Sequence, residues 1–289
     1  MKRCLKCYFN YKSYNWTCSK CGNVPKSING LPAFAPESAI SSRGFKSEAF
    51  QELAKLETDN FWFQARNHLI LWALRRHYPK MKRYLEIGCG TGFVLRSVRS
   101  SYPKASLAGS EILSAGLSFA FQRVPGAELI QMDARQIPYS NEFDVIGAFD
   151  VLEHIEEDMN VLFEINRALV IGGGLFNTVP QHLWLWSGAD EVACHVRRYQ
   201  IGELRSKLER IGFRVEFETS FVSLLLPVMF ALRFFKKVTS LEDAVAELQL
   251  PKIINRTFSV VMTLERGLIK AGLRFPFGGS SLLVARKIR

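Results

Sequence analysis

Hydrophobic and polar positions divide the chain into a short N-terminal part and a long part in which apolar runs alternate with amphipathic stretches. Apolar residues recur at helical spacing over residues 47–77, and Pro79 follows. This spacing predicts a helical region that ends before the proline. From residue 83 onward, short apolar runs alternate with helical stretches, which is typical of βα units that build a parallel sheet.

The apolar runs predict seven strands, at 83–88, 106–110, 128–132, 144–149, 174–179, 214–221 and 281–287. Helices are expected at 92–101, 112–123, 156–169 and 201–211. About sixty residues separate the last two strands, and long structureless loops are rare in compact domains. Residues 221–280 are therefore predicted to be a helical insert, with helices near 221–235 and 253–273. The expected fold is an α/β, doubly wound, seven-stranded and mostly parallel sheet.

The N-terminal part has a different composition from the rest. Residues 1–22 hold four of the six cysteines, and residues 23–45 are rich in proline, glycine and serine. We therefore predict a cysteine module over 1–22, a linker over 23–45 and one large domain over 46–289. No signal peptide or spanning segment is recognised, so a cytoplasmic protein with reduced cysteines is expected.

Charge is unevenly distributed along a basic chain whose formal net charge is +11. Residues 61–104 carry a net +8, whereas residues 105–170 hold 11 acidic and 3 basic residues, a net −8. Apolar residues make up 48%, which excludes a disordered or collagen-like chain. The acidic middle argues against a uniformly basic surface for nucleic acid.

The cysteines are spaced as metal ligands. Cys4 and Cys7 form one C-x-x-C pair, and Cys18 and Cys21 form another after ten residues. Two such pairs can hold one tetrahedral Zn²⁺, which supplies folding energy that so short a segment lacks. We therefore predict a zinc ribbon. Its aromatic and lysine residues leave three uses open: nucleic-acid stacking, protein binding, and packing on the large domain.

A glycine-rich turn follows the first predicted strand of the large domain. Gly88, Gly90 and Gly92 lie at alternate positions before a helix, so a ligand can approach the backbone and the free N–H groups there. The next three strands end in Glu111, in Asp133 with Ala134, and in Asp150. The carboxyl ends of parallel strands share one sheet edge, so these groups are expected to line one crevice.

At these residues the sequence resembles class I S-adenosylmethionine-dependent methyltransferases, which have a Rossmann-like sheet. The resemblance implies that Glu86 and the three glycines line the methionine part of S-adenosylmethionine. It implies that Glu111 holds the ribose hydroxyls, that Asp133 and Ala134 contact the adenine, and that Asp150 lies beneath the transferred methyl group. Arg66, in Phe-Trp-Phe-Gln-Ala-Arg, is a further candidate for the cofactor carboxylate.

Candidate catalytic residues follow the fourth strand. The segment Asp150-Val-Leu-Glu153-His154, with the later His195, resembles ubiquinone-biosynthesis O-methyltransferases and small-RNA 2′-O-methyltransferases. That resemblance implies a divalent metal such as Mg²⁺ on Asp150, Glu153, His154 and His195, although Asp150 replaces a longer Glu. The alternatives are metal-free proton transfer, with His154 as first and His195 as second candidate, and a structural role.

The expected activity is methyl transfer from S-adenosylmethionine, most simply O-methylation of a small or lipid-linked acceptor such as a glycan or isoprenoid. One alternative is an RNA methyltransferase that uses the ribbon to bind RNA; another is a binding module without turnover. The apolar run at 221–237 predicts either a substrate lid or peripheral contact with the inner face of the membrane. Nothing in the sequence fixes the oligomeric state.

Overall fold

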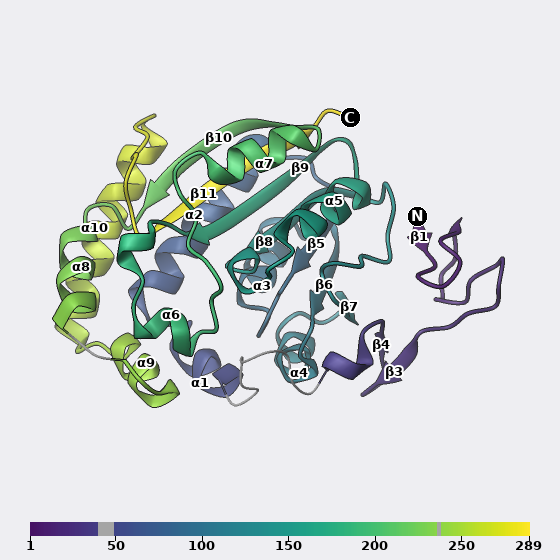
Figure 1. The fold of residues 1–289 in the computed structure, drawn as a ribbon, viewed down its shortest axis with the longest axis horizontal. Coiled ribbons are helices and arrows are strands. Elements are labelled where there is room, and N and C mark those ends of the chain that lie inside the picture. The colour runs from purple at the N-terminus through teal and green to yellow at the C-terminus, as the bar shows by residue number, and fades with distance from the viewer. Residues whose placement is uncertain (40–48, 236–237) are drawn as a thin grey trace.

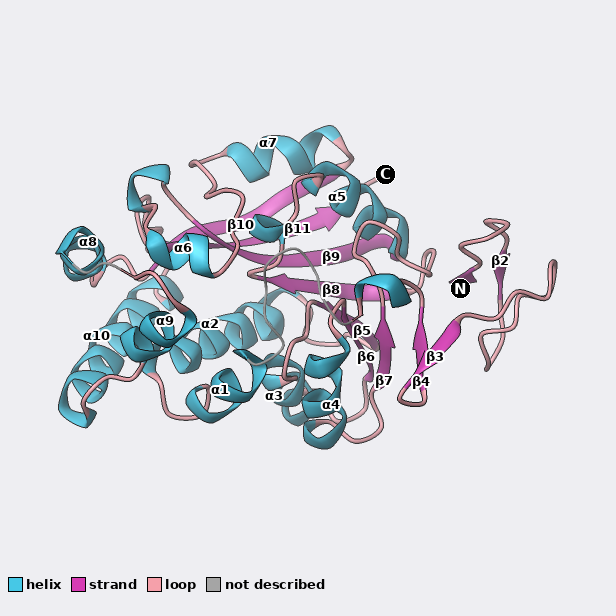
Figure 2. Ribbon diagram, turned by 60° about the horizontal axis from the view of Figure 1, so that its bottom comes forward, coloured by secondary structure: helices cyan, strands magenta, loops and turns pink. Residues whose placement is uncertain are grey.

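The computed structural model describes residues 1–39, 49–235 and 238–289. Residues 40–45 of the expected linker and residues 46–48 at the start of the large domain lie outside the described residues. One sheet dominates the described part, with helices on both of its faces (Figure 1, Figure 2).

The predicted α/β fold is confirmed. The seven strands are β5 (Arg83–Ile87), β6 (Ser106–Glu111), β7 (Glu128–Gln131), β8 (Phe143–Phe149), β9 (Leu169–Pro180), β10 (Phe213–Phe221) and β11 (Ser280–Lys287). Their order is β10-β11-β9-β8-β5-β6-β7, and only β11 runs antiparallel to its neighbours in this set. The chain adds β6 and β7 on one side of β5 and β8 on the other. The strand order therefore reverses at β5, where α/β sheets bind ligands.

Helices pack in two layers on the sheet (Figure 2). One layer contains α2 (Phe61–His77), α3 (Phe93–Ser101) and α4 (Ser114–Arg123), and the other contains α5 (Asp158–Ala168) and α7 (Glu203–Arg210). Each layer has its own core cluster, with Leu74 and Leu95 in one and Ile165 and Leu208 in the other. Both faces of the sheet are thus buried, as parallel sheets require.

The predicted helical region before the sheet consists of two helices, α1 (Ala49–Leu56) and α2. Asn60 separates them, because its side-chain oxygen accepts a hydrogen bond from the Trp62 amide at 2.9 Å and caps α2. Asparagine is a preferred residue at this position.

Part of the expected linker is a hairpin that extends the sheet. Strands β3 (Lys26–Ile28) and β4 (Leu31–Ala33) pair around Asn29 and Gly30, which have φ of 52° and 79°. Asn-Gly is the usual sequence of such a two-residue turn. Strand β4 then pairs in parallel with β7, and the short helix η1 (Pro36–Ser38) follows it. The described sheet therefore has nine strands.

The insert before β11 contains α8 (Leu226–Phe235), α9 (Leu241–Leu248) and α10 (Lys252–Lys270). The short helix α9, which the apolar pattern does not predict, begins with a capping box of Ser240 and Asp243. Helix α10 packs against α2, and its buried Glu265 accepts hydrogen bonds from the backbone that leads into α8. None of the described helices is long and apolar enough to cross a membrane.

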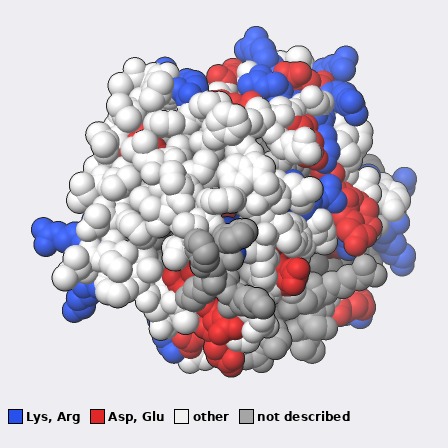
Figure 3. Space-filling view, turned by 60° about the vertical axis from the view of Figure 1, so that its left-hand side comes forward, with Lys and Arg blue, Asp and Glu red and all other residues white. Residues whose placement is uncertain are grey.

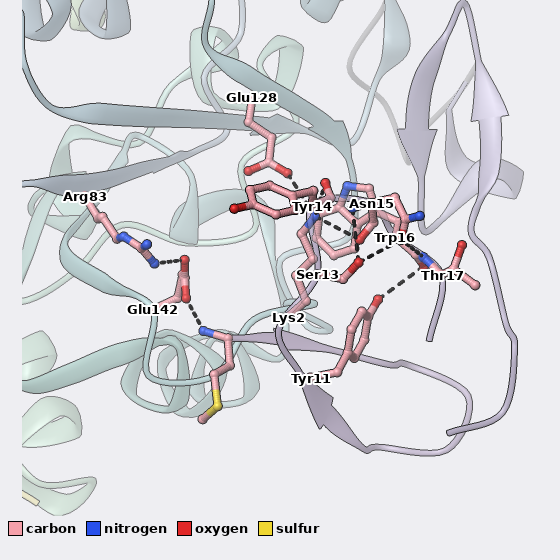
Figure 4. A network of polar contacts seen from close by, with 11 residues as sticks. Lys2, Tyr11, Ser13, Tyr14, Asn15, Trp16, Thr17, Arg83, Glu128 and Glu142 are labelled. Atoms are coloured by element: carbon pink, nitrogen blue, oxygen red, sulfur yellow. Dashed lines mark hydrogen bonds and ion pairs between the residues drawn. The ribbon is translucent and has the colours of Figure 1, made fainter. Parts of the chain in front are cut away.

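The cysteine module packs against the large domain at the amino ends of the sheet strands, opposite the glycine-rich turn. Its strands are β1 (Lys2–Arg3) and β2 (Asn10–Tyr11). Trp16 packs edge-on against Phe34 and Tyr139, at ring-centroid distances of 4.7 and 5.3 Å. The N-terminal amine pairs with Glu142, which also pairs with Arg83 at the start of β5 (Figure 4). Packing on the large domain, which is one of the three predicted uses, is therefore present in the structure.

Candidate active site

A cavity of about 760 Å³ opens at the carboxyl ends of β5, β6, β7 and β8. Most of the sequence-predicted residues line it: Arg66, Glu86, Gly88, Gly90, Glu111, Asp133, Ala134, Asp150, His154 and His195. Gly92 and Glu153 do not line the cavity. Gly92 lies at the start of α3, and Glu153 is buried in the interior. No described residue of the 221–280 insert lines the cavity, which differs from the expected lid.

The glycine-rich turn uses left-handed backbone at all three glycines, with φ of 64° at Gly88, 49° at Gly90 and 78° at Gly92. A Cβ on Gly88 would lie 2.5 Å from the Val151 side chain, and one on Gly92 would lie 2.9 Å from the backbone of Ala120. Two of the three glycines therefore allow close packing, whereas Gly90 faces the cavity.

Glu111 closes the turn from the second strand. The Gly90 amide donates to one carboxylate oxygen at 3.0 Å, and the amides of Ile112 and Leu113 donate to the other at 2.9 and 3.3 Å. Burial raises the pKa of Glu111, while these three donors oppose the shift. The carboxylate is thus fixed in one orientation at the cavity wall.

Glu86 lies deeper, at the end of β5. It is 3% exposed, and the Tyr84 hydroxyl donates to it at 3.2 Å. Burial raises the pKa of Glu86 to about 8. A carboxyl group in such a setting is mostly protonated near neutral pH and ionises when a cation comes close.

The acidic end of the third strand already has a cationic partner. Asp133 pairs with Arg135 at 2.6 Å, Arg135 also pairs with Glu157 at 2.9 Å, and all three residues line the cavity. Ala134 is buried beside them and lines the cavity. These residues form the wall next to the β4 hairpin.

Asp150 sits directly after β8 with a φ of 56°, a strained conformation for a residue with a side chain. Its carboxylate pairs with Arg66 of α2 and accepts a hydrogen bond from the Thr178 hydroxyl at 3.1 Å. The Arg66 guanidinium also lies over the Trp62 ring, 4.6 Å from its centroid. Arg66 thus meets a protein carboxylate, at the edge of the cavity where the resemblance places a cofactor carboxylate.

Three of the four expected catalytic residues come together. Ligand atoms of Glu153, His154 and His195 all lie within 4.8 Å of one another, and the two imidazole rings are 4.8 Å apart edge-on. Asp150 is outside this cluster. Burial, reinforced by the charge of Asp150, raises the pKa of Glu153 well above its usual value. Burial, reinforced by His195, lowers the pKa of His154 to about 4.

Sequence reasoning missed Asp190, which holds His195 in place. Asp190 is buried in the short helix α6 (Gly188–Val192), and its Oδ1 lies 2.9 Å from Nδ1 of His195. Arg198 and Arg233 also pair with it, at 2.8 and 2.7 Å. These contacts hold the pKa of Asp190 well below its usual range. The five-residue separation of Asp190 and His195 was available in the sequence, but no recognised motif contains it.

A second missed residue is Glu57, which lines the cavity from the turn after α1. It accepts a hydrogen bond from the Thr91 hydroxyl at 2.8 Å and pairs with Arg123 of α4 at 2.6 Å. Arg123 continues to the Ala54 carbonyl at 3.0 Å. This network ties α1 to the glycine-rich turn, and no local sequence pattern links its members.

The four cysteines of the N-terminal module form a second cluster. All four Sγ atoms lie within 4.8 Å of one another, and the pairs Cys4–Cys21 and Cys7–Cys18 are 3.6 Å apart. A tetrahedral zinc site with bonds of about 2.3 Å places its sulfurs about 3.8 Å apart. The cluster therefore fits the predicted zinc ribbon.

Comparison with known proteins agrees with the fold. Residues 85–177 match the family described as methyltransferase domain. A probable S-adenosylmethionine-dependent methyltransferase of Mycolicibacterium smegmatis is 26% identical over 56% of this chain and 62% of its own. Malonyl-[acyl-carrier protein] O-methyltransferase of Legionella pneumophila is 28% identical over 43% of this chain and 48% of its own. The chain thus spans about half the length of these relatives.

Among solved structures, phosphoethanolamine N-methyltransferase 2 of Haemonchus contortus in complex with S-adenosyl-L-methionine has a TM-score of 0.56 at 17% identity. The match covers 86% of this chain and 58% of that one. The matched residues 85–177, the strand order and the glycine-rich turn are together similar to those of class I S-adenosylmethionine-dependent methyltransferase domains.

Proposed function

We propose that the protein transfers a methyl group from S-adenosylmethionine to a hydroxyl of a small or lipid-linked acceptor. The observation that carries the proposal is His195, which borders the same cavity as the residues predicted to bind the cofactor and contacts the buried carboxylate of Asp190. Methyl transfer to oxygen needs a group that takes up the hydroxyl proton, and an imidazole oriented in this way suits that task.

The residues present fit the cofactor. Glu111 has both carboxylate oxygens fixed by backbone donors at the cavity wall, which suits two adjacent ribose hydroxyls. The glycine-rich turn and Glu86 would border the methionine part, and Ala134 with Asp133 would border the adenine. When bound, S-adenosylmethionine supplies an electrophilic methyl group on a cationic sulfur, next to the acidic groups of this wall.

The reaction step balances without a further reactant. The acceptor oxygen forms a bond to the methyl carbon as the carbon–sulfur bond breaks, and the electron pair stays on sulfur to give S-adenosylhomocysteine. The hydroxyl proton passes to Nε2 of His195. Asp190 stabilises the resulting imidazolium through its contact with Nδ1.

An oxygen acceptor is supported by the relative from Legionella pneumophila, whose name is that of an O-methyltransferase acting on an acyl carrier. Apolar side chains of Trp62, Phe149, Ile155 and Val196 line the same cavity as the two histidines. They favour an acceptor with an apolar portion.

The test is production of S-adenosylhomocysteine by the full chain with polar lipid extract, isolated isoprenyl phosphates, small organic acids and RNA as separate acceptors. Turnover with a lipid or small hydroxyl compound, lost in His195→Gln with cofactor binding retained, supports the proposal. Turnover with RNA alone contradicts the acceptor class, and cofactor binding without turnover favours a binding module.

A metal-assisted version of the same site rests on one observation. Both oxygens of the buried Glu153 carboxylate lack a hydrogen-bond partner within the described residues, and two imidazoles lie beside them. One carboxylate and two histidines suit Zn²⁺, Fe²⁺ or Ni²⁺ better than the Mg²⁺ that the sequence resemblance implies. A bound metal would polarise the acceptor hydroxyl. Activity that is indifferent to chelators contradicts this version.

We also propose that Cys4, Cys7, Cys18 and Cys21 hold one structural zinc. The sulfur separations match a tetrahedral site, and the module has little core besides Tyr11. Elemental analysis of the purified protein tests this proposal, with one zinc per chain expected and less than half of one in Cys18→Ser. A wild-type chain without zinc overturns it.

A further inference from the structure

Helix α10 is apolar on two sides. Its inner side buries Met262 and Ile269 against the domain. Its outer side exposes Ile253, Val260, Leu264 and Leu268, with 82, 64, 59 and 36% of each residue accessible to solvent. Single exposed apolar residues are ordinary, but a row of four along one helix marks an interaction surface.

Cations flank this row. The basic residues of α10 are Lys252, Arg256, Arg266 and Lys270, and none of them forms an ion pair with any residue that the structure describes. At 100° per residue they fall within about 80° of helix circumference, next to the outer apolar row. Glu265 is the one acidic residue in the helix sequence, and it is buried. The outer side of α10 therefore combines an apolar strip with an uncompensated positive strip.

Neighbouring segments enlarge the apolar surface. Val228, Phe230 and Leu232 of α8 are each 41–48% exposed, and Trp184 packs edge-on against Phe230 at 5.8 Å. Figure 3 shows this end of the molecule as a broad face with little charge, with basic side chains at its left margin and acidic ones gathered at its lower margin. We call this face, formed by the exposed residues of α8 and α10, the α8/α10 face.

We infer that the α8/α10 face binds the surface of an anionic lipid bilayer, with α10 lying flat against it. A helix of 19 residues is roughly 28 Å long, and an apolar strip beside a cationic one is the pattern of interfacial helices. The apolar row enters the boundary between acyl chains and headgroups, and the cations meet lipid phosphates.

Charge complementarity favours this occupant over a second copy of the chain. An antiparallel two-fold dimer through α10 would bring the row of cations on one copy against the same row on the other. An anionic bilayer compensates all four cations at once. The inference does not depend on methyl transfer, because vesicle binding is measured without an acceptor.

The experiment is flotation of the full chain with vesicles of phosphatidylcholine, alone or with about 30 mol % phosphatidylglycerol. Wild type is expected to float with anionic vesicles and to bind neutral ones at least about tenfold more weakly. The double variant Val260→Asp with Leu264→Asp is expected to lose at least about tenfold in binding. The matched control is Ile171→Asp, at an exposed apolar position near the start of β9, and it should bind like wild type.

A charge variant separates the two strips. Lys252→Glu with Lys270→Glu should weaken binding to anionic vesicles about 20-fold or more and make the remainder insensitive to salt. Because all four substituted positions are exposed, circular dichroism and thermal melting should match wild type. Wild type that floats with neither vesicle overturns the inference, as does wild-type affinity in the Val260 and Leu264 variant. A dimer that this variant dissociates assigns the face to a second copy and also overturns it.

Discussion

The two halves of the cavity are built differently. In the half proposed to bind the cofactor, the glycine-rich turn, Glu111 and Asp133 lie at the ends of three consecutive strands, and backbone amides at most 21 residues away donate to the two carboxylates. In the half proposed to bind the acceptor, His195 contacts Asp190, which pairs with Arg198 and with Arg233 of α8, 43 residues further along the chain than Asp190. The first half is a local motif and the second is assembled from separate segments. Substitutions should therefore separate cofactor binding from turnover.

The largest effect is expected in the acceptor half. Asp190→Asn removes the charge that orients His195 and stabilises its imidazolium, so turnover should fall on the order of 100-fold or more. Affinity for S-adenosylmethionine should stay within about twofold, because Asp190 does not line the cavity. Single-turnover rates and equilibrium binding measure the two effects. Glu191→Gln, an exposed neighbour on α6, is the control, and equal losses in both variants would contradict the role of Asp190.

A smaller effect is expected in the cofactor half. Glu111→Gln leaves the side chain in place but replaces one accepting oxygen by a donor that faces backbone N–H groups. Affinity for S-adenosylmethionine should fall at least about tenfold, since a hydrogen bond to a charged group is worth about 1.5–3 kcal/mol. Calorimetric titration measures it. An unchanged dissociation constant would show that the ribose lies elsewhere.

The affinity for S-adenosylmethionine should also depend on pH, because of Glu86. The pKa of Glu86 is raised to about 8, so the side chain is mostly protonated near pH 7 and must lose its proton when the cationic cofactor binds. Affinity should therefore rise between about pH 6 and 7.5, by at most about tenfold per pH unit. Affinity rises with pH because the cationic cofactor favours the ionised form of the Glu86 carboxyl group. Glu86→Gln should remove this pH dependence of cofactor affinity. Glu164 also has a raised pKa but does not line the cavity, so Glu164→Gln should retain the dependence.

The smallest effect on cofactor affinity is expected from a substitution in the zinc ribbon. Cys18→Ser should lower the melting temperature by several degrees, because Trp16 and the N-terminal amine lose their places on the domain. Affinity for S-adenosylmethionine should stay within about twofold, since the ribbon packs at the opposite, amino ends of the sheet strands. Differential scanning calorimetry and titration test both statements. A large loss of affinity would mean that the ribbon shapes the cavity.

The difference between a local motif and a site assembled from separate segments also explains what the sequence could predict. The seven strands and the cofactor wall were predicted because apolar period and strand-end carboxylates are local signals, as at Gly88 and Glu111. The pairing of Asp190 with Arg233 and of Glu57 with Arg123 depends on tertiary packing, which leaves no periodic trace. The Asn29-Gly30 hairpin carried a local signal, but the surrounding prolines and glycines also fit a linker. Site roles remain predictions, whereas the fold is confirmed.

The most direct test of the account is titration of S-adenosylmethionine into wild type and Gly90→Arg. Gly90 faces the cavity with a φ of 49°, so an arginine there strains the turn and fills the space for the cofactor. Gly126→Arg is the matched control, since Gly126 has a φ of 78° and open space around it. We expect saturable 1:1 binding by wild type and by Gly126→Arg, and none by Gly90→Arg. Equal binding by all three would contradict the assignment of this cavity to the cofactor.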